Sequence, residues 1–438
     1  MLKLPSLSLD FGLGRRGSGS DIVGLDIQPG LVAAVKAHVN GSIRAERAAA
    51  QPLDADTVRE GEVVDVEALS EALRELFSGG TLGKRVRVGI ANQRTVMRTL
   101  ELPPITDRKE LAAAVRFQAQ DQVPMPLSNA VLDFHPLGIF DSPGGPRQRV
   151  VLVAAQRDMV ERLLEAVRSA GLVAEGVDLS AFALIRALYD RAGGEGERVL
   201  YVNVDGLTNL AIAEGKVCRF TRVVGGGVET MASELAVRRN IALADARALL
   251  ASIDLSTPLV PAAAAALEPV EHDGGEPAPE QHTSEQLDAG EHEPDSEALA
   301  AEPALSRAEH EAREVSMGYL ETIEAAHSST SAPEAAPVAQ ASDGDVREVL
   351  ENGVREIAGE IRNSLDFHRT QDQGGEVAHV SLSGGALDLP GFAQALQATL
   401  GMEVRSDAVG LVDAELDGRV STHRLSVAAG LATTEAPQ

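Results

Sequence analysis

The sequence of 438 residues contains a single cysteine, Cys218. One cysteine excludes a disulfide within the chain and fits a protein of a reducing compartment. No run approaches the roughly 18 uninterrupted apolar residues that a membrane-spanning helix needs. Residues 1–20 also hold no apolar core of the kind found in signal peptides. We therefore expect a soluble protein that stays in the cytoplasm.

Positive charge is scarce, because 39 lysine and arginine residues face 66 aspartate and glutamate residues, a net charge of −27. A surface of this sign repels the phosphates of nucleic acids and the headgroups of anionic lipids. Binding to nucleic acid, or to a membrane by bulk charge, is therefore not expected. Apolar residues make up 44% of the chain, which is enough for a sizeable core.

Residues 257–345 hold most of the negative charge. This segment has twenty acidic residues against two basic ones, Arg307 and Arg313, and consists otherwise mostly of alanine, proline and glycine. Such a composition cannot bury enough apolar surface to offset the entropy lost on ordering, so we expect a disordered insertion. Its histidines are irregularly spaced and do not predict a metal site. Within it, residues 306–326 fit a transient helix and a coil equally well.

Outside this segment, one pattern of predicted elements occurs twice. Each copy reads strand, acidic turn, strand, turn, strand and helix. In the first copy the elements are expected at 22–27, 31–39, 43–49 and 64–77. In the second copy they are expected at 198–204, 208–213, 217–224 and 228–239. The repeat predicts two similar halves that face each other.

The region between the two copies breaks this pattern and indicates an inserted α/β unit at about 104–175. Helices are predicted there over 107–121 and 157–170, and after the acidic segment a long helix is predicted over 346–367. The expected divisions are a flexible segment (1–20), a first lobe with the insert (21–197), a second lobe in two parts (198–256 and 346–433), the acidic insertion (257–345) and a tail (434–438).

Three glycine-bearing turns follow predicted strands: "GLDIQPG", "VNVDGLT" and "SLSGGALDLPG". Backbone N–H groups in such turns can hold phosphate oxygens, and glycine allows the close approach that this needs. Asp26 and Asp205 lie in two of these turns and are candidate ligands for Mg²⁺. The alternative is that each aspartate caps its own turn, since aspartate is common where strands end.

The order of these features resembles the actin-like nucleotide-binding fold and, within it, the PilM family of type IV pilus assembly proteins. The matching stretches are "VGLDIQPG", "RTLELPPITDRKELAAAVRFQAQDQVPMPLSNAVLDF", "VLVAAQRDMVERLLEAVRSAGL", "FTRVVGGG", "EIRNSLDFHR" and "VSLSGGALDLPGF". The helix that leads to Val123-Pro124 is the most specific of these, because actins and sugar kinases lack it. The resemblance covers 20–256 and 346–433. It implies an α/β fold of two ribonuclease-H-like lobes, with the inserted subdomain and the acidic insertion added.

The resemblance also implies a site for ATP or ADP with Mg²⁺ between the lobes. Asp26 and Asp205 would be the metal ligands, and no catalytic residue is predicted. The implied nucleotide-binding residues are Asp26, Ile27, Gln28, Pro29, Gly30, Asn203, Asp205, Gly206, Thr208, Gly225, Gly226, Gly227, Ser383, Gly384, Gly385 and Ala386.

The chain departs from the family's pattern in each of its nucleotide motifs. Family members read Asp-Ile-Gly-Ser and then a lysine at the first turn, where this chain has Gln28, Pro29 and Ala33. Pro29 removes an N–H donor. The second turn, Asp-Ile-Gly in the family, ends in Asp205, whose charge repels phosphate unless a cation intervenes. The family's Ala-Glu-x-x-Lys motif becomes residues 246–250, without its glutamate or lysine. These departures argue against nucleotide binding and more strongly against hydrolysis.

We carry three hypotheses for the function. The first is a cytoplasmic scaffold at the inner face of the membrane, which binds the N-terminal tail of a PilN-like membrane protein near 94–102 and 104–150, with other pilus components as further partners. An extended tail of this kind could add to a sheet edge. The second is an active actin-like ATPase or small-molecule kinase. The third is a division protein similar to FtsA, against which the chain shows no amphipathic helix after residue 433.

Overall fold

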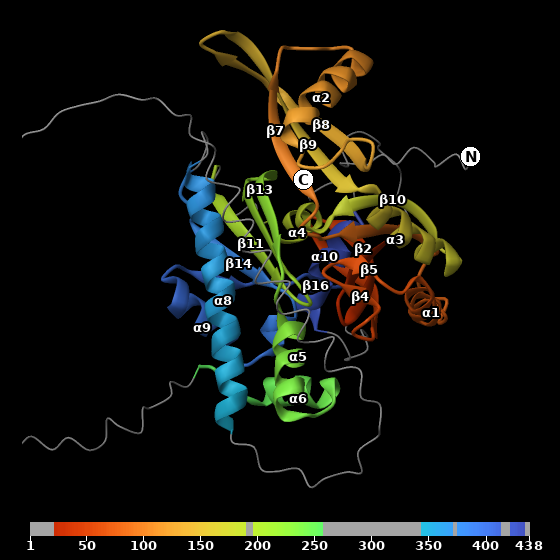
Figure 1. The fold of residues 1–438 in the computed structure, drawn as a ribbon, viewed down its shortest axis with the longest axis vertical. Coiled ribbons are helices and arrows are strands. Elements are labelled where there is room, and N and C mark those ends of the chain that lie inside the picture. The colour runs from red at the N-terminus through yellow and green to blue at the C-terminus, as the bar shows by residue number, and fades with distance from the viewer. Residues whose placement is uncertain (1–21, 190–195, 257–342, 371–374, 413–420, 434–438) are drawn as a thin grey trace, which may run out of the picture. The chain divides into compact units, whose positions relative to one another are not determined.

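The computed structural model describes residues 22–189, 196–256, 343–370, 375–412 and 421–433, and its two largest sheets share the same core topology (Figure 1). The strand orders are β10-β6-β1-β2-β3-β16 and β13-β12-β11-β14-β15. In each sheet three consecutive strands pair antiparallel, and a fourth strand runs parallel to the first of them. This duplication confirms the predicted pair of ribonuclease-H-like lobes. The acidic segment, except for its last three residues, lies outside the described residues, as does 306–326.

The strand bounds agree with the expected pattern in both copies. The first sheet contains β1 (Val23–Gln28), β2 (Leu31–Asn40), β3 (Ser42–Pro52), β6 (Arg85–Ile90), β10 (Val173–Leu179) and β16 (Gly410–Leu411). The second contains β11 (Arg198–Val204), β12 (Thr208–Glu214), β13 (Val217–Val224), β14 (His379–Ser383) and β15 (Val404–Ser406). A short hairpin of β4 (Val58–Arg59) and β5 (Glu62–Val63) follows β3.

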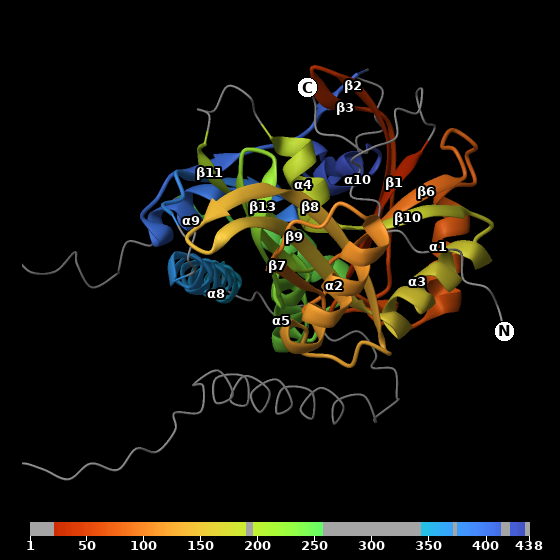
Figure 2. The ribbon, with the colours of Figure 1, turned by 90° about the horizontal axis from the view of Figure 1, so that it is seen from above.

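Helices pack on the sheets through apolar residues that recur every three or four positions along each helix. On the first sheet, α1 (Val66–Leu76) and α3 (Arg157–Ser169) bury leucine and valine side chains against β1 and β6. On the second sheet, the covering elements are α5 (Val228–Arg239), α6 (Leu243–Ser252), α8 (Asp343–Thr370), η1 (Gly385–Asp388) and α9 (Phe392–Leu400). Figures 1 and 2 both show α8 and α9 on the same side of this sheet.

The inserted unit is a three-stranded sheet with one helix. It comprises β7 (Val96–Leu102), α2 (Arg108–Gln122), β8 (Ala130–Ser142) and β9 (Gly145–Gln156), in the strand order β7-β9-β8. Asp107 caps α2 by accepting hydrogen bonds from the N–H groups of Lys109 and Glu110. Strand pairing therefore places this unit at 96–156, whereas the sequence suggested about 104–175. The difference arises because α3 packs on the first sheet and β7 pairs with β9.

The last described residues return to the first lobe. Helix η2 (Thr422–Leu425) leads into α10 (Ser426–Leu431), which packs against β1, β2 and α4 (Ser180–Leu188). Helix α4 also contacts β11 and β12, so it bridges the two sheets. The buried Arg87 of β6 donates hydrogen bonds to the carbonyl oxygens of Leu431 (3.1 Å) and Thr433 (2.9 Å). The end of α10 is thereby fixed to the first sheet.

Close packing of α10 on α4 requires a glycine at position 430. A Cβ atom built there would lie 1.9 Å from the carbonyl oxygen of Ala183. We therefore expect Gly430→Ala to lower the free energy of unfolding by about 1–3 kcal/mol, the usual range for overpacking a core. Gly359→Ala in α8 is the matched control, because a Cβ atom there meets nothing within 4 Å. That change should stabilise the chain by up to about 1 kcal/mol through helix propensity. Urea unfolding of both variants checks this, and equal effects of the two would contradict it.

Candidate functional site

The turns that follow β1 and β11 touch each other across the two lobes. Pro29 and Gly30 form the first turn, in which Gly30 has a φ of +81°, a conformation that favours glycine. A Cβ atom built on Gly206 in the second turn would lie 2.4 Å from the carbonyl oxygen of Pro29. Only a glycine allows this approach. The two turns predicted to hold phosphate therefore pack directly against each other.

Asp26, in β1 close to the first turn, is buried, and its charge interacts with that of Asp205 in the second lobe. Its carboxylate accepts hydrogen bonds from the side-chain amide of Gln28 at 3.2 and 3.4 Å. Burial raises the pKa of Asp26 to about 7, and the nearby charge of Asp205 acts in the same direction, while the hydrogen bond from Gln28 lowers it. Near neutral pH this carboxyl group is therefore a mixture of its protonated and ionised forms.

Asp205, directly after β11, is 4% exposed and has three donors around its carboxylate. The N–H of Gly385 donates to Oδ1 at 2.7 Å, and the side-chain amide of Asn203 donates to Oδ2 at 3.2 Å. The guanidinium group of Arg424 donates from Nη1 to Oδ1 at 3.3 Å, and from Nε to Asp388 at 2.7 Å. Burial raises the pKa of Asp205, and Arg424, Gly385 and Asn203 oppose that rise. We call Asn203, Asp205, Gly385, Asp388 and Arg424 the Asp205 cluster.

The glycine triplet 225–227 adjoins the same turn and leads into α5. Thr208 donates a hydrogen bond to the carbonyl oxygen of Gly226 (2.9 Å), and the N–H of Val228 donates to that of Asp205 (2.7 Å). Glu229 in the first turn of α5 reaches the first lobe, since a Cβ atom on Gly30 would lie 2.6 Å from its Cδ. Arg247 of α6 donates three hydrogen bonds to Glu229.

The structure thus brings most of the predicted site residues to one place. Two of them face away from it, because Ile27 packs in the apolar core of the first lobe and Ala386 in that of the second. Sequence reasoning missed Arg424, Asp388 and Glu229. No local pattern marks Arg424, which lies 219 residues from Asp205 along the chain.

This arrangement does not fit a nucleotide's phosphates. Pro29 offers no N–H, Gly206 is in contact with the first turn, and the N–H of Gly385 is already bonded to Asp205. The fit to Mg²⁺ is also poor, because the cation of Arg424 already bonds Asp205. Among the described residues, no group of three or more His, Cys, Asp or Glu side chains could hold a metal ion.

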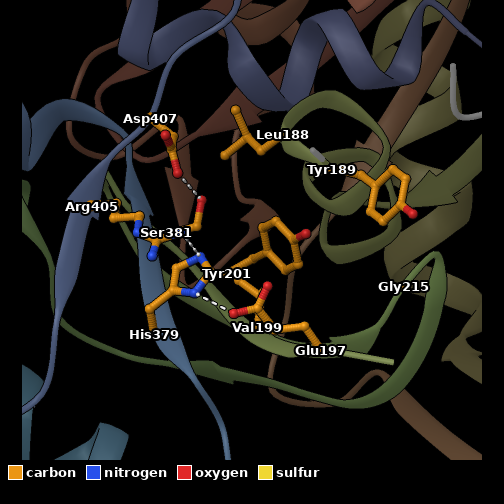
Figure 3. A pocket seen from close by; sticks show the side chains of 10 residues that line it. All are labelled: Leu188, Tyr189, Glu197, Val199, Tyr201, Gly215, His379, Ser381, Arg405 and Asp407. Atoms are coloured by element: carbon orange, nitrogen blue, oxygen red, sulfur yellow. Dashed lines mark hydrogen bonds and ion pairs between the residues drawn. The ribbon is translucent and has the colours of Figure 1, made fainter. Parts of the chain in front are cut away.

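A separate polar recess of about 120 Å³ lies at the opposite end of β11 and β14 from the glycine turns (Figure 3). Ser381 donates a hydrogen bond to Asp407 at 2.6 Å, and Arg405 lies 3.3 Å from Nε2 of His379. Because a guanidinium group only donates, Nε2 accepts and the ring proton is on Nδ1, which lies 3.6 Å from Glu197. The recess is distinct from the predicted site.

In the described part of the chain, every helix is too short or too polar to span a membrane.

The raised pKa of Asp26 predicts that stability falls as pH rises. The unfolded chain releases this proton near pH 3.8, the ordinary pKa of an aspartate side chain, whereas the folded protein keeps it until about pH 7. Stability is therefore lost between these two values. We expect Asp26→Asn to raise the free energy of unfolding at pH 8 by a few kcal/mol, at roughly 1.4 kcal/mol per pKa unit, with little effect near pH 4.

Urea unfolding from pH 4 to 8 measures this difference. The exposed Asp121, changed to Asn in the same way, is the control for removing a carboxylate from the surface instead of from the interior. A gain for Asp26→Asn that is the same at both ends of the range would contradict the assignment.

Comparison with known proteins identifies a family and a solved structure that share this architecture. A family model described as "Type IV pilus assembly protein PilM" matches residues 24–248, from β1 into α6 and including the whole inserted unit. The solved "PilM-PilN type IV pilus biogenesis complex" is 21% identical, covers 95% of this chain and 98% of that chain, and has a TM-score of 0.64, which shows a shared fold.

Two further structures are more distant. The ethanolamine utilization protein EutJ from Carboxydothermus hydrogenoformans is 14% identical, covering 94% of this chain and 89% of its own, with a TM-score of 0.44. MreB 5 of Spiroplasma citri, solved with AMPPNP, is 10% identical, with coverages of 93% and 94% and a TM-score of 0.46. The fold is the predicted actin-like one, and the family model spans more than half of the chain. The chain belongs to the PilM family of type IV pilus assembly proteins.

Proposed function

We propose that this protein is a scaffold of type IV pilus assembly that binds the extended N-terminal tail of a PilN-like membrane protein through its inserted unit. The observation that carries the proposal is the family match, which runs through the whole of that unit. The similarity in fold to a solved PilM-PilN complex supports the same partner. A chain with a net charge of −27 is repelled by anionic lipid, so we propose that the partner holds it at the inner face of the membrane.

The inserted sheet offers two edges for such a tail, because its strand order is β7-β9-β8. Strand β8 contains Pro136 and a register shift between Pro136 and Gly138. Proline and bulges both interrupt a row of backbone donors and acceptors, which protects an edge from pairing. Strand β7 has no proline, and its pairing with β9 keeps one register along all seven residues. The edge of β7 is therefore the better one for strand addition.

The side chains of β7 also suit a template for an extended peptide. Leu100 and Leu102 are buried under α2 and fix the strand in place. Arg98, Thr99 and Glu101 are exposed along the same strand. A bound tail would draw affinity from its main-chain hydrogen bonds and specificity from contacts with alternate side chains.

A second candidate function, an ATPase or kinase on the same fold, is less well supported. Phosphoryl transfer needs a phosphate cradle, a metal ion and a positioned base. The direct contact between the two glycine turns argues against a phosphate cradle, and the ion pair of Asp205 with Arg424 argues against a metal ion. We propose a degenerate nucleotide site, so Mg-ATP turnover should stay at background. Steady turnover that Asp26→Ala abolishes would instead favour the enzyme.

Binding of the tail is tested with a synthetic peptide of the N-terminal residues of the PilN-like protein from the same genome. Isothermal titration against the full chain should show saturable 1:1 binding. Alternate N-methylation of the peptide removes main-chain donors and should weaken binding at least tenfold if the peptide adds as a strand.

Two matched variants distinguish the edges. Thr99→Lys places a charge on β7 and should weaken binding at least tenfold, whereas Ile139→Lys on β8 should leave it unchanged. Both side chains are exposed, so neither change disturbs the core. The proposal fails if the folded chain does not bind the peptide. If only Ile139→Lys weakens peptide binding, the binding edge is β8 instead of β7.

A further inference from the structure

The Asp205 cluster joins the two lobes through a single arginine. Arg424 belongs to η2, which continues into α10, and α10 packs on the first sheet. Its two carboxylate partners, Asp205 and Asp388, follow strands β11 and β14 of the second sheet. The ion pairs of Arg424 therefore cross from one lobe to the other.

Hydrogen bonds between uncharged groups beside Arg424 also connect the two lobes. The hydroxyl of Ser383 donates a hydrogen bond to the carbonyl oxygen of His423 at 2.9 Å and lies 2.8 Å from the hydroxyl of Ser426. The N–H of Gly384 donates to the same carbonyl oxygen at 3.2 Å. These contacts fix the backbone on both sides of Arg424, so its guanidinium group is held in position at the second lobe.

The donors around Asp205 are those of an anion site. A backbone N–H, a side-chain amide and a guanidinium group converge on one carboxylate, and together they would serve an oxygen of a phosphate equally well. A Cβ atom built on Gly385 would lie 2.5 Å from the Arg424 guanidinium and 2.6 Å from Oδ1 of Asp205. No room is left there for a second anion while the carboxylate is in place.

We propose that the carboxylate of Asp205 fills an anion site of the protein's own making and, through Arg424, clamps the two lobes together without a nucleotide. The site takes phosphate or pyrophosphate only when that carboxylate is removed. The scaffold would then hold a closed cleft at all times, instead of gaining and losing it with a ligand. The clamp does not depend on binding of the partner peptide, so the two proposals can be tested independently.

The test measures binding of pyrophosphate, and separately of Mg-ATP, to the full chain by isothermal titration. The unchanged protein should show no saturable binding of either. Asp205→Ala exposes the Gly385 N–H and the Arg424 guanidinium, so it should gain saturable binding of pyrophosphate. Asp388→Ala is the matched control, because it removes another carboxylate from the same arginine and leaves Asp205 in place. It should stay without binding.

A second variant covers the case in which Asp205→Ala does not fold. Asp205→Gly also removes the carboxylate, and it gives the second turn the glycine that family members have there, so it should gain pyrophosphate binding too. Arg424→Gln should speed hydrogen exchange of the Gly30 amide in the first turn and of the amides of residues 205–207 in the second turn, relative to the unchanged chain.

Several results would overturn the proposal. The first is that the unchanged protein binds Mg-ATP saturably and that Asp205→Ala does not strengthen this binding. The second is that Arg424→Gln leaves hydrogen exchange unaltered at both turns. Equal gains for Asp205→Ala and Asp388→Ala would show a general charge effect and equally reject it. Titrating the partner peptide into the same samples separates failure of the clamp from failure of the proposed function.

Discussion

A carboxylate that is buried between two lobes must find its hydrogen-bond donors within the protein, and Asp205 meets that requirement at the centre of this molecule. Removing an ionised group from water costs several kcal/mol, so it persists only where charge and donors compensate. Here the compensation comes from the N–H of Gly385, the amide of Asn203 and the cation of Arg424. Each lies on a different segment of the chain. Satisfying one side chain therefore fixes the relative position of three segments.

The duplicated topology explains why these segments meet. In each sheet the first strand runs parallel to the fourth, so the turns after β1, β11 and β14 lie at corresponding edges. Glycines at 30, 206 and 385 have no side chain of their own that would hold these turns apart. Proline, aspartate and arginine side chains from neighbouring positions occupy the remaining space between the turns. In this member of the PilM family, the protein's own side chains therefore occupy the region between the turns.

Much of this arrangement could be predicted from the sequence, because it rests on local patterns. The repeated order of strands, acidic turns and helices predicted both sheets, and the motif order predicted the family. The limits of the insert were harder to place. Strand periodicity does not reveal which strand is the neighbour of β7, and so it does not show that β7 pairs with β9 in the insert. Arg424 was missed for a related reason, since its partners are set by tertiary packing and no spacing near it signals an ion pair.

The return of the chain to its first lobe has a consequence for biosynthesis. Strand β1 is among the first described segments to leave the ribosome, but α10, which covers it, is among the last. Domains generally fold as units during synthesis, starting from the N-terminal side. In this protein the first lobe cannot complete its core until the second lobe and the acidic segment have both been translated. A nascent chain therefore exposes one apolar face of its first sheet throughout most of elongation. This face is available to chaperones until α10 has been synthesised.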